Sequence, residues 1–189
     1  MDKSKRITAL KAALAQRILV LDGAMGTAIQ SFDLGPDDFG GPEYEGCNEY
    51  LVVTRPDVIE SIHQGHLDAG ADIIETDTFG AMPIVLSEYS LAHEARRLNR
   101  EAAVIALKAA DAAATPEKPR FVAGSMGPTT KTISVTGGVT FEELADSYHV
   151  QASGLIEGGA DLLLLETGQD TLNIKAGLEG IDRAFVELG

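Results

Sequence analysis

Continuous apolar runs alternate along the chain with segments in which apolar residues recur every three or four positions. The four runs that are typical of strands are residues 17–22, 71–76, 120–124 and 161–167. Strands that are apolar throughout are usually covered on both faces, as in a parallel sheet. The segments with helical spacing are residues 54–70, 91–114, 140–159 and 171–188, after a leading helix within residues 1–17. This alternation predicts right-handed βαβ units and hence an α/β fold.

Local signals mark the ends of two of these helices. Thr54 and Asp57 have the spacing of a capping box, with Asp in place of the usual Glu, and Gly70 follows the last apolar position of the same helix. Thr140 and Glu143 have the same spacing at the start of a later helix. We therefore expect side-chain caps at Thr54 and Thr140 and a glycine stop at Gly70.

A weak internal repeat narrows the fold class. The segments "AGADIIET" and "GGADLLLLET" share a glycine that ends a helix, then Ala-Asp, an apolar run and Glu-Thr. Repeated units favour a TIM-type (β/α)8 barrel over a doubly wound sheet. A complete barrel takes ~250 residues, whereas this chain has 189 and about four units. We expect one partial barrel domain over residues 1–189. Such a half-barrel is expected to form a homodimer, to need the missing second half of the barrel, or to be only marginally stable.

Composition argues against several kinds of partner. The chain has 15 Lys and Arg against 29 Asp and Glu, which gives a net charge of -14. Nucleic acid and anionic membrane surfaces repel so acidic a chain, so neither is an expected partner. No apolar run approaches the ~20 residues that span a bilayer, and the N-terminal segment has no signal-peptide core. The single cysteine, Cys47, suits a reducing compartment, and we expect a cytoplasmic protein.

Polar residues follow each of the four expected strands. They occupy residues 22–23, 75–78, 124–129 and 166–167. In parallel α/β folds the carboxyl ends of the strands form one rim, and ligands bind there. Carboxylates on this rim can bind an ammonium group, and glycine N–H groups can hold a carboxylate. The rim therefore suits a small substrate that carries an amine.

Several of these features also have a structural interpretation. The Asp22-Gly23 pair can be an ordinary turn after a strand, and the glycines match neither a Walker loop nor a G-x-G-x-x-G motif. His63 and His66 lie three residues apart on an outer helix, where solvated or packed histidines are commoner than a metal pair. Cys47 stands alone, without the further ligands of a zinc site. From the residues alone, the prediction stops at an α/β rim that binds something small and polar.

Four longer motifs resemble those of the homocysteine S-methyltransferase family. They are "ILVLDGAMGTAIQ", "CNEYLVVTRPDVIESIHQGHLDAGADIIETDTFGA", "GSMGPTTK" and "EGGADLLLLETGQDTLNIKA". The resemblance runs from about Arg17 to the C-terminus and is strongest to the homocysteine-binding module of the cobalamin-dependent members. It implies a (β/α)8 barrel that binds homocysteine at its carboxyl-end rim. The implied reaction is methyl transfer to the homocysteine thiolate, which gives methionine.

The resemblance also implies roles for individual residues. Asp22 and Gly23 match the substrate loop after the family's first strand, where a side chain and the backbone meet the amino acid. Thr76 matches the threonine that touches the polar end of the substrate. Glu166 matches the glutamate that holds the ammonium group. Residues 125–128 match a wall of the same pocket.

The cofactors that the resemblance implies would bind outside this chain. In the family, a zinc ion on three cysteines takes the substrate sulfur as a further ligand and lowers its thiol pKa. Those cysteines belong to the second half of the barrel, and Cys47 matches none of them. Methylcobalamin and methyltetrahydrofolate bind through further modules. We therefore expect no metal ligands or catalytic residues here, and a substrate-binding portion that is inactive alone. The alternatives are a non-catalytic amino-acid-binding or scaffold half-barrel, and a phosphate-binding α/β domain.

Overall fold

A parallel three-stranded sheet lies at the centre of the computed structural model, which describes residues 3–188. Its strands are β1 (Ile73–Glu75), β2 (Phe121–Met126) and β3 (Leu162–Leu165), in the order β1-β2-β3. Val122 pairs with Ile74 on one side, and Ser125 pairs with Leu164 on the other. Strands that are neighbours in sequence are thus neighbours in the sheet, as the repeated βα units predict, and the α/β fold class is confirmed.

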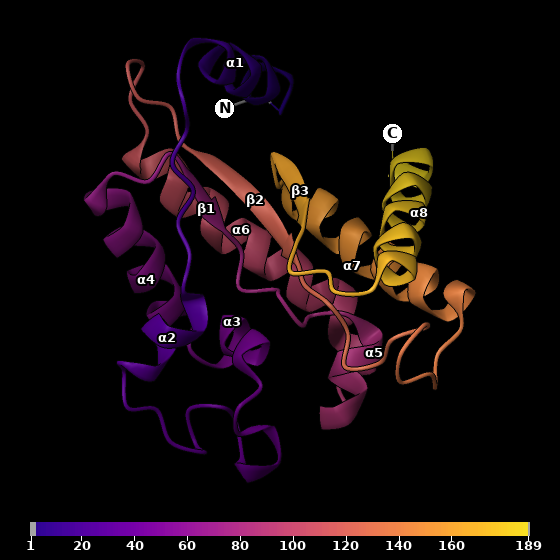
Figure 1. Ribbon diagram of the computed structural model, residues 1–189. Coiled ribbons are helices and arrows are strands. Elements are labelled where there is room, and N and C mark those ends of the chain that lie inside the picture. Colours follow the sequence, from indigo (N-terminus) through magenta and orange to yellow (C-terminus); the bar gives the residue numbers. More distant parts are fainter. Residues whose placement is uncertain (1–2, 189) are drawn as a thin grey trace.

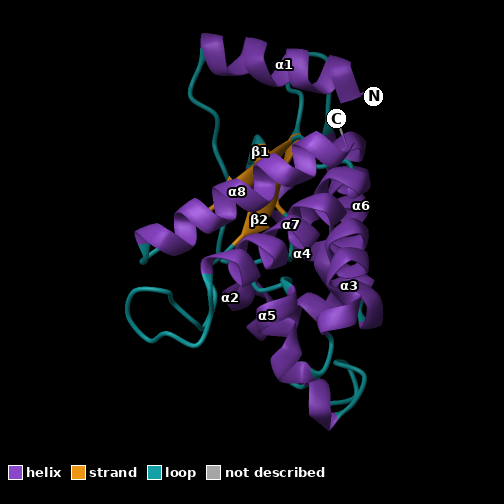
Figure 2. Ribbon diagram, turned by 90° about the vertical axis from the view of Figure 1, so that its right-hand side faces the viewer, coloured by secondary structure: helices purple, strands orange, loops and turns teal. Residues whose placement is uncertain are grey.

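Helices pack against one face of this sheet (Figures 1 and 2). They are α4 (Pro56–Ala69), α6 (Ala95–Ala113), α7 (Phe141–Gly158) and α8 (Thr171–Leu188). The shorter helices α2 (Met25–Gln30), α3 (Leu51–Thr54) and α5 (Pro83–Leu86) belong to the loops near the carboxyl ends of the strands. Within residues 3–188, no helix has the length and apolar character needed to cross a membrane.

The main core fills the space between the sheet and these helices. Val122 and Met126 of β2 contact a cluster that includes Leu144 and Leu155 of α7 and the alanines of α6. Helices α6 and α7 approach closely at Gly154, where an added Cβ would lie 2.5 Å from the Arg96 carbonyl oxygen. Small residues are therefore required at this crossing, which explains the many alanines and glycines in these two helices.

The expected first strand, residues 17–22, is correctly placed but is only a single bridge. Leu21 pairs in parallel with Ile73, and the Val20 carbonyl accepts a hydrogen bond from the Ile73 N–H at 3.1 Å. Ile18 is 91% exposed and Val20 is 58% exposed, so neither side chain is held by packing. The prediction of a full strand is wrong because apolar side chains alone do not extend a ladder at a sheet edge without burial.

The predicted helix signals have different outcomes. At the start of α7, the Glu143 N–H donates to Thr140 Oγ1 at 3.2 Å and the Thr140 N–H donates to Glu143 Oε2 at 2.8 Å, so this capping box is confirmed. Gly70 ends α4 in the left-handed conformation with φ 110°, also as predicted. Helix α6 begins at Ala95, later than expected, after a 3-10 turn over Ala92–Glu94.

The predicted capping box at Thr54 is absent from the start of α4. Thr54 is the last residue of α3, and α4 begins at Pro56 with Arg55 as its N-cap. Asp57 does not cap the helix and instead forms an ion pair with the Arg55 guanidinium at 2.7 Å. Arg55 competes successfully for Asp57 because a bond between two charged groups is stronger than the capping-box bond from a neutral backbone N–H.

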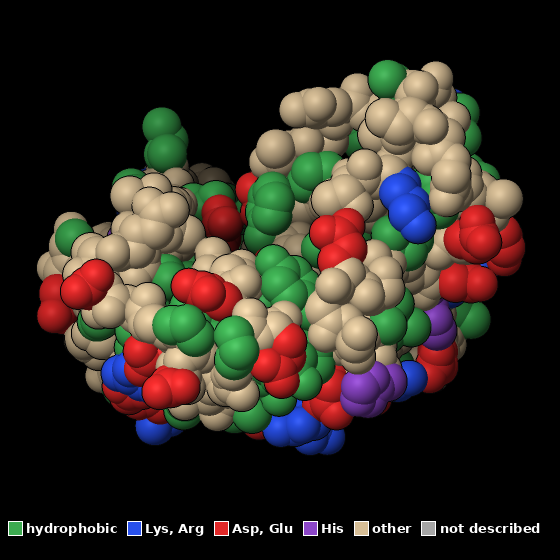
Figure 3. Space-filling view, turned by 90° about the horizontal axis from the view of Figure 1, so that it is seen from below, with side chains coloured by type: hydrophobic (Ala, Val, Ile, Leu, Met, Phe, Trp, Pro, Cys, Tyr) green, Lys and Arg blue, Asp and Glu red, His purple; other side chains and the backbone are tan. Residues whose placement is uncertain are grey.

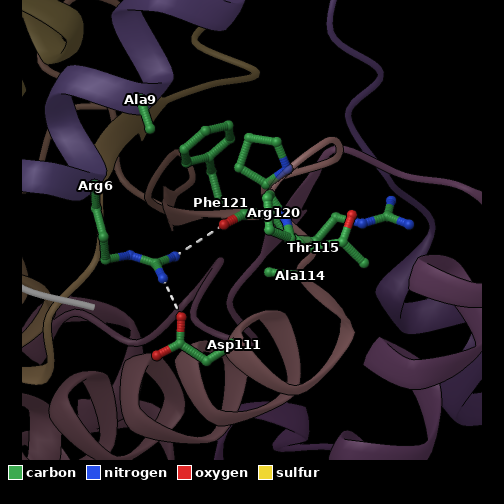
Figure 4. A pocket seen from close by; sticks show the side chains of 9 residues that line it. Arg6, Ala9, Asp111, Ala114, Thr115, Arg120 and Phe121 are labelled. Carbon is green, nitrogen blue, oxygen red and sulfur yellow. Dashed lines mark hydrogen bonds and ion pairs between the residues drawn. The ribbon is translucent and has the colours of Figure 1, made fainter.

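Helix α1 (Lys3–Gln16) lies across the amino-terminal end of the sheet, as Figure 2 shows. Its anchor is Arg6, only 4% exposed, which bonds both carboxylate oxygens of Asp161 at 2.7 and 2.8 Å and the Arg120 carbonyl at 3.0 Å. Figure 4 shows Arg6 pointing toward Asp111 beside a hollow of about 450 Å³ at this end. These contacts fix the end of the sheet opposite to the strand-end loops.

Candidate functional site

The polar residues that follow the strands surround a cavity at the carboxyl end of the sheet. Its volume is about 290 Å³, and it is lined by Ala24, Met25, Gly26, Asn48, Glu49, Glu75, Thr76, Asp77, Phe79, Ser125 and Glu166. Viewed from this end, the molecule is hollowed between two lobes, with acidic side chains in and beside the hollow (Figure 3). The hollow near Arg6 is larger, but polar residues from the ends of β1, β2 and β3 meet at the smaller cavity, so we take the smaller one as the candidate site.

The cavity is strongly acidic. Four of its lining residues are Asp or Glu, and none of them is Lys, Arg or His. A fifth carboxyl group, that of Asp22, lies at its edge, where Oδ1 accepts a hydrogen bond from the Glu75 N–H at 2.8 Å. A concave surface with this charge attracts cations and repels anions. The phosphate-binding alternative therefore has no electrostatic support at this site.

Asp22 and Gly23 position the loop that borders the cavity. Neither residue lines it, but Ala24, Met25 and Gly26 do. Ala24 has a left-handed backbone with φ 58°, a conformation that costs energy for a residue with a Cβ and that is concentrated at functional sites. Burial raises the pKa of Asp22 to about 7, so its carboxyl group is partly protonated at neutral pH. A direct contact of Asp22 or Gly23 with substrate stays a prediction.

Glu75 and Glu166 bring two carboxyl groups together across the sheet. Burial, the negative charge of Glu166 and then that of Asp22 raise the pKa of Glu75 to about 7. Ser125 donates its hydroxyl hydrogen to Glu166 Oε1 at 2.6 Å, which orients this carboxylate. Two facing carboxyl groups either share a proton or hold a cation between them. Glu75 was not among the predicted site residues, although its position at a strand end was the signal that could have selected it.

Thr76 is buried, and its hydroxyl group joins β1 to β2. Thr78 donates to the Ser125 carbonyl at 2.7 Å, so the 2.6 Å bond between the two threonine hydroxyls must be donated by Thr76. Thr76 Oγ1 also accepts from the Ser125 N–H at 3.0 Å. Its only hydroxyl hydrogen is therefore used, and toward a ligand it can act only as an acceptor. Its predicted contact with the substrate is untested.

Two further acids in the cavity wall were not among the predicted site residues. Glu49 Oε1 accepts from the Gly80 N–H at 2.7 Å, and burial raises the pKa of Glu49. Asp77 is only 5% exposed, and its Oδ2 has no hydrogen-bond partner. Burial and then the charge of Glu49 raise the pKa of Asp77 well above its usual value. Glu49 comes from a loop without periodicity, so no sequence pattern placed it here.

The described residues do not fit a zinc site. Cys47 is buried, and burial followed by the charge of Glu49 raises the pKa of its thiol to about 12, so it stays protonated. Zinc requires a thiolate and further ligands, and residues 3–188 contain no group of three or more His, Cys, Asp or Glu that could hold a metal ion. His63 is buried, and burial lowers its pKa to about 4, so it is the neutral packed histidine that we expected.

Residues 19–187 match the family model of homocysteine S-methyltransferase, and the chain belongs to this family. It is 46% identical to methionine synthase of Mycobacterium leprae over 182 residues, which are 96% of this chain and 15% of that protein. It is 45% identical to methionine synthase of Mycobacterium tuberculosis over 188 residues, which are 100% of this chain and 16% of that protein. The chain thus spans a small part of these relatives.

Solved structures with a similar fold include the homocysteine methyltransferase MmuM of Escherichia coli. Its oxidized form superposes with a TM-score of 0.75 at 25% identity, over 92% of this chain and 61% of that one. Its metallated form gives a TM-score of 0.75 at 26% identity, over 94% and 63% of the two chains. The sheet and helices of this chain are therefore arranged as in a longer protein of the same family.

Proposed function

We propose that this chain is the homocysteine-binding portion of a methyltransferase of the methionine synthase type. The reaction of the whole enzyme would transfer a methyl group to the sulfur of homocysteine and give methionine, in methionine biosynthesis in the cytoplasm. The observation that carries this proposal is the pair of facing carboxyl groups, Glu75 and Glu166, in a cavity with no basic lining residue. An ammonium group between them replaces the repulsion with two charge-assisted contacts.

The roles of the predicted residues follow from this placement. Glu166, held by the Ser125 hydroxyl, would bind the substrate ammonium together with Glu75. Asp22 accepts a hydrogen bond from the Glu75 N–H at the cavity edge, and its carboxyl group would help to attract the substrate ammonium there. The backbone that follows Gly23 would contact the amino acid, and Thr76 would accept a hydrogen bond from the ammonium.

We also propose that the fold is the first half of a TIM-type (β/α)8 barrel. Strands in sequence order with helices on one side are what half of such a barrel requires. The opposite sheet face carries Ile73, Leu162 and Leu164, which are partly exposed and pair with the inward positions of β2. A second half, from further chain or from a second copy, would cover this face and the exposed edge at Ile18.

The sulfur chemistry would belong to residues outside residues 3–188. Zinc bound elsewhere in the enzyme would supply a thiolate, and methylcobalamin and methyltetrahydrofolate would supply the methyl group. The contribution of this chain is to bind homocysteine and hold its amino-acid end in place. We therefore expect no methyl transfer by this chain alone, and zinc-dependent methylation of homocysteine by the purified chain would contradict this assignment.

Titration calorimetry with L-homocysteine tests the binding role. We expect binding that survives a metal chelator and that weakens by about 1–3 kcal/mol in Glu166→Gln, because a neutral amide loses the charge-assisted contact. Glu117→Gln, an exposed position on the loop before β2, is the matched control and should bind like wild type. Absence of homocysteine binding would refute the proposal, and competition by inorganic phosphate would support the phosphate-binding alternative instead.

A further inference from the structure

The cavity must also accommodate the carboxylate of an amino acid. All charged side chains that line it are acidic, so an anionic group meets repulsion from Glu75 and Glu166 unless neutral donors hold it. The hydroxyl donors in the wall are already used, since Thr76 donates to Thr78 and Ser125 donates to Glu166. Apart from the Asn48 amide and the backbone after Gly23, which also line the cavity, a neutral acid is the remaining side chain that can donate to the carboxylate.

Asp77 has the properties of such a donor. Asp77 is among the residues that line the cavity, it is only 5% exposed, and its buried Oδ2 has no hydrogen-bond partner. A buried carboxylate oxygen without a partner carries a desolvation cost, which favours the neutral form of this group. A neutral carboxylic acid has one O–H donor, unlike the carboxylate, which only accepts.

The neighbouring acid favours the neutral form of Asp77. Glu49 accepts a hydrogen bond from the Gly80 N–H at 2.7 Å, and such bonds stabilise its ionised form. Asp77 has no comparable bond at Oδ2, and the charge of Glu49 disfavours a second charge beside it. Glu49 is therefore a positioning residue that maintains the neutral state of Asp77.

We propose that Asp77 is a substrate-binding residue that donates a hydrogen bond from its neutral carboxyl group to the carboxylate of the amino-acid substrate. This inference rests on the proposed function. It assigns unlike roles to the acids of the cavity, with Glu166 and Glu75 for the ammonium and a neutral acid, Asp77, for the carboxylate.

The test compares two ligands that differ only in the carboxylate. L-homocysteine and 3-aminopropane-1-thiol are titrated by calorimetry into wild type, Asp77→Asn, Asp77→Ala and the exposed control Asp37→Asn. We expect Asp77→Asn to bind homocysteine within about threefold of wild type, because a carboxamide also donates. Asp77→Ala should weaken homocysteine at least about tenfold and 3-aminopropane-1-thiol less than about twofold. Asp37→Asn should change neither affinity.

Circular dichroism establishes that each variant is folded, and Asp77→Leu, close in shape to Asp, replaces Asp77→Ala if the latter does not fold. The inference is overturned if the apolar variant binds homocysteine like wild type or loses both ligands equally. It is also overturned if Asp77→Asn loses as much homocysteine affinity as the apolar variant does. A wild type that binds neither ligand removes the proposed function and this inference together, whereas a wild type that binds homocysteine with unaffected Asp77 variants removes only the inference.

Discussion

Removing one carboxyl group from the edge of the acidic cavity should stabilise the ligand-free protein. Asp22 is the suitable position because burial raises its pKa from 3.8 to about 7. Between these pH values the folded protein holds a proton that the unfolded chain has already released. The free energy of unfolding therefore falls as the pH rises from 3.8 to about 7. Above about pH 7 the stabilisation that comes from the bound proton is fully lost. Asp22→Asn removes the titration and keeps an oxygen that can accept from the Glu75 N–H.

The expected change in the free energy of unfolding follows from the pH range that an experiment can cover. From pH 5.5 to about 7 the window spans about 1.5 pH units, which corresponds to about 2 kcal/mol at 1.36 kcal/mol per unit. Asp22 is partly exposed, and its titration is linked to that of Glu75, so about 1–2 kcal/mol is the expected range. The advantage of Asp22→Asn over wild type should grow by this amount between pH 5.5 and pH 8.

Urea unfolding followed by far-ultraviolet circular dichroism measures this difference at both pH values. Asp37→Asn, in an exposed loop, is the control for removing one negative charge from a chain of net charge -14. Its free energy of unfolding should differ from that of wild type by the same amount at both pH values. If the advantage of Asp22→Asn is equally large at pH 5.5 and pH 8, the Asp22 carboxyl group is not protonated in the folded state. The argument from burial would then be wrong.

Three further predictions concern packing and assembly. Gly154→Ala should lower the free energy of unfolding by about 1–3 kcal/mol in urea titrations, because its Cβ would lie 2.5 Å from the Arg96 carbonyl oxygen. Arg6→Met should lower the free energy of unfolding by about 3–5 kcal/mol in the same assay, because the Asp161 carboxylate would stay buried without Arg6. An unchanged urea midpoint would show that α1 does not depend on this ion pair. Sedimentation at micromolar concentration should reveal a dimer that covers the exposed sheet edge at Ile18, whereas a compact, cooperatively unfolding monomer would argue against the half-barrel pairing.

The sequence predicted those parts of the fold that local pattern determines. The runs around Val122 and Leu163 are apolar at every position, and both become strands of the sheet. The run ending at Leu21 is similarly apolar, yet it forms only one bridge. The length of a strand also depends on whether other parts of the fold bury it, and the run's own residues do not determine this. Thr54 failed as a cap for a similar reason, since Arg55 provided a stronger partner for Asp57.

The candidate site shows a different limit of sequence reasoning. Strand-end position could place Glu75 and Glu166 on one rim, because parallel strands end together. It could not place Glu49, whose loop reaches the cavity only through the tertiary fold, where its carboxylate meets the Gly80 N–H. Nor could it separate Asp77 from Glu166, since both are acids after a strand. Their difference comes from partners, because Glu166 accepts from a hydroxyl group while Asp77 leaves an oxygen unpaired. These partners are a property of the folded cavity, and in our proposal they separate the acids that bind the ammonium from the one that donates to the carboxylate.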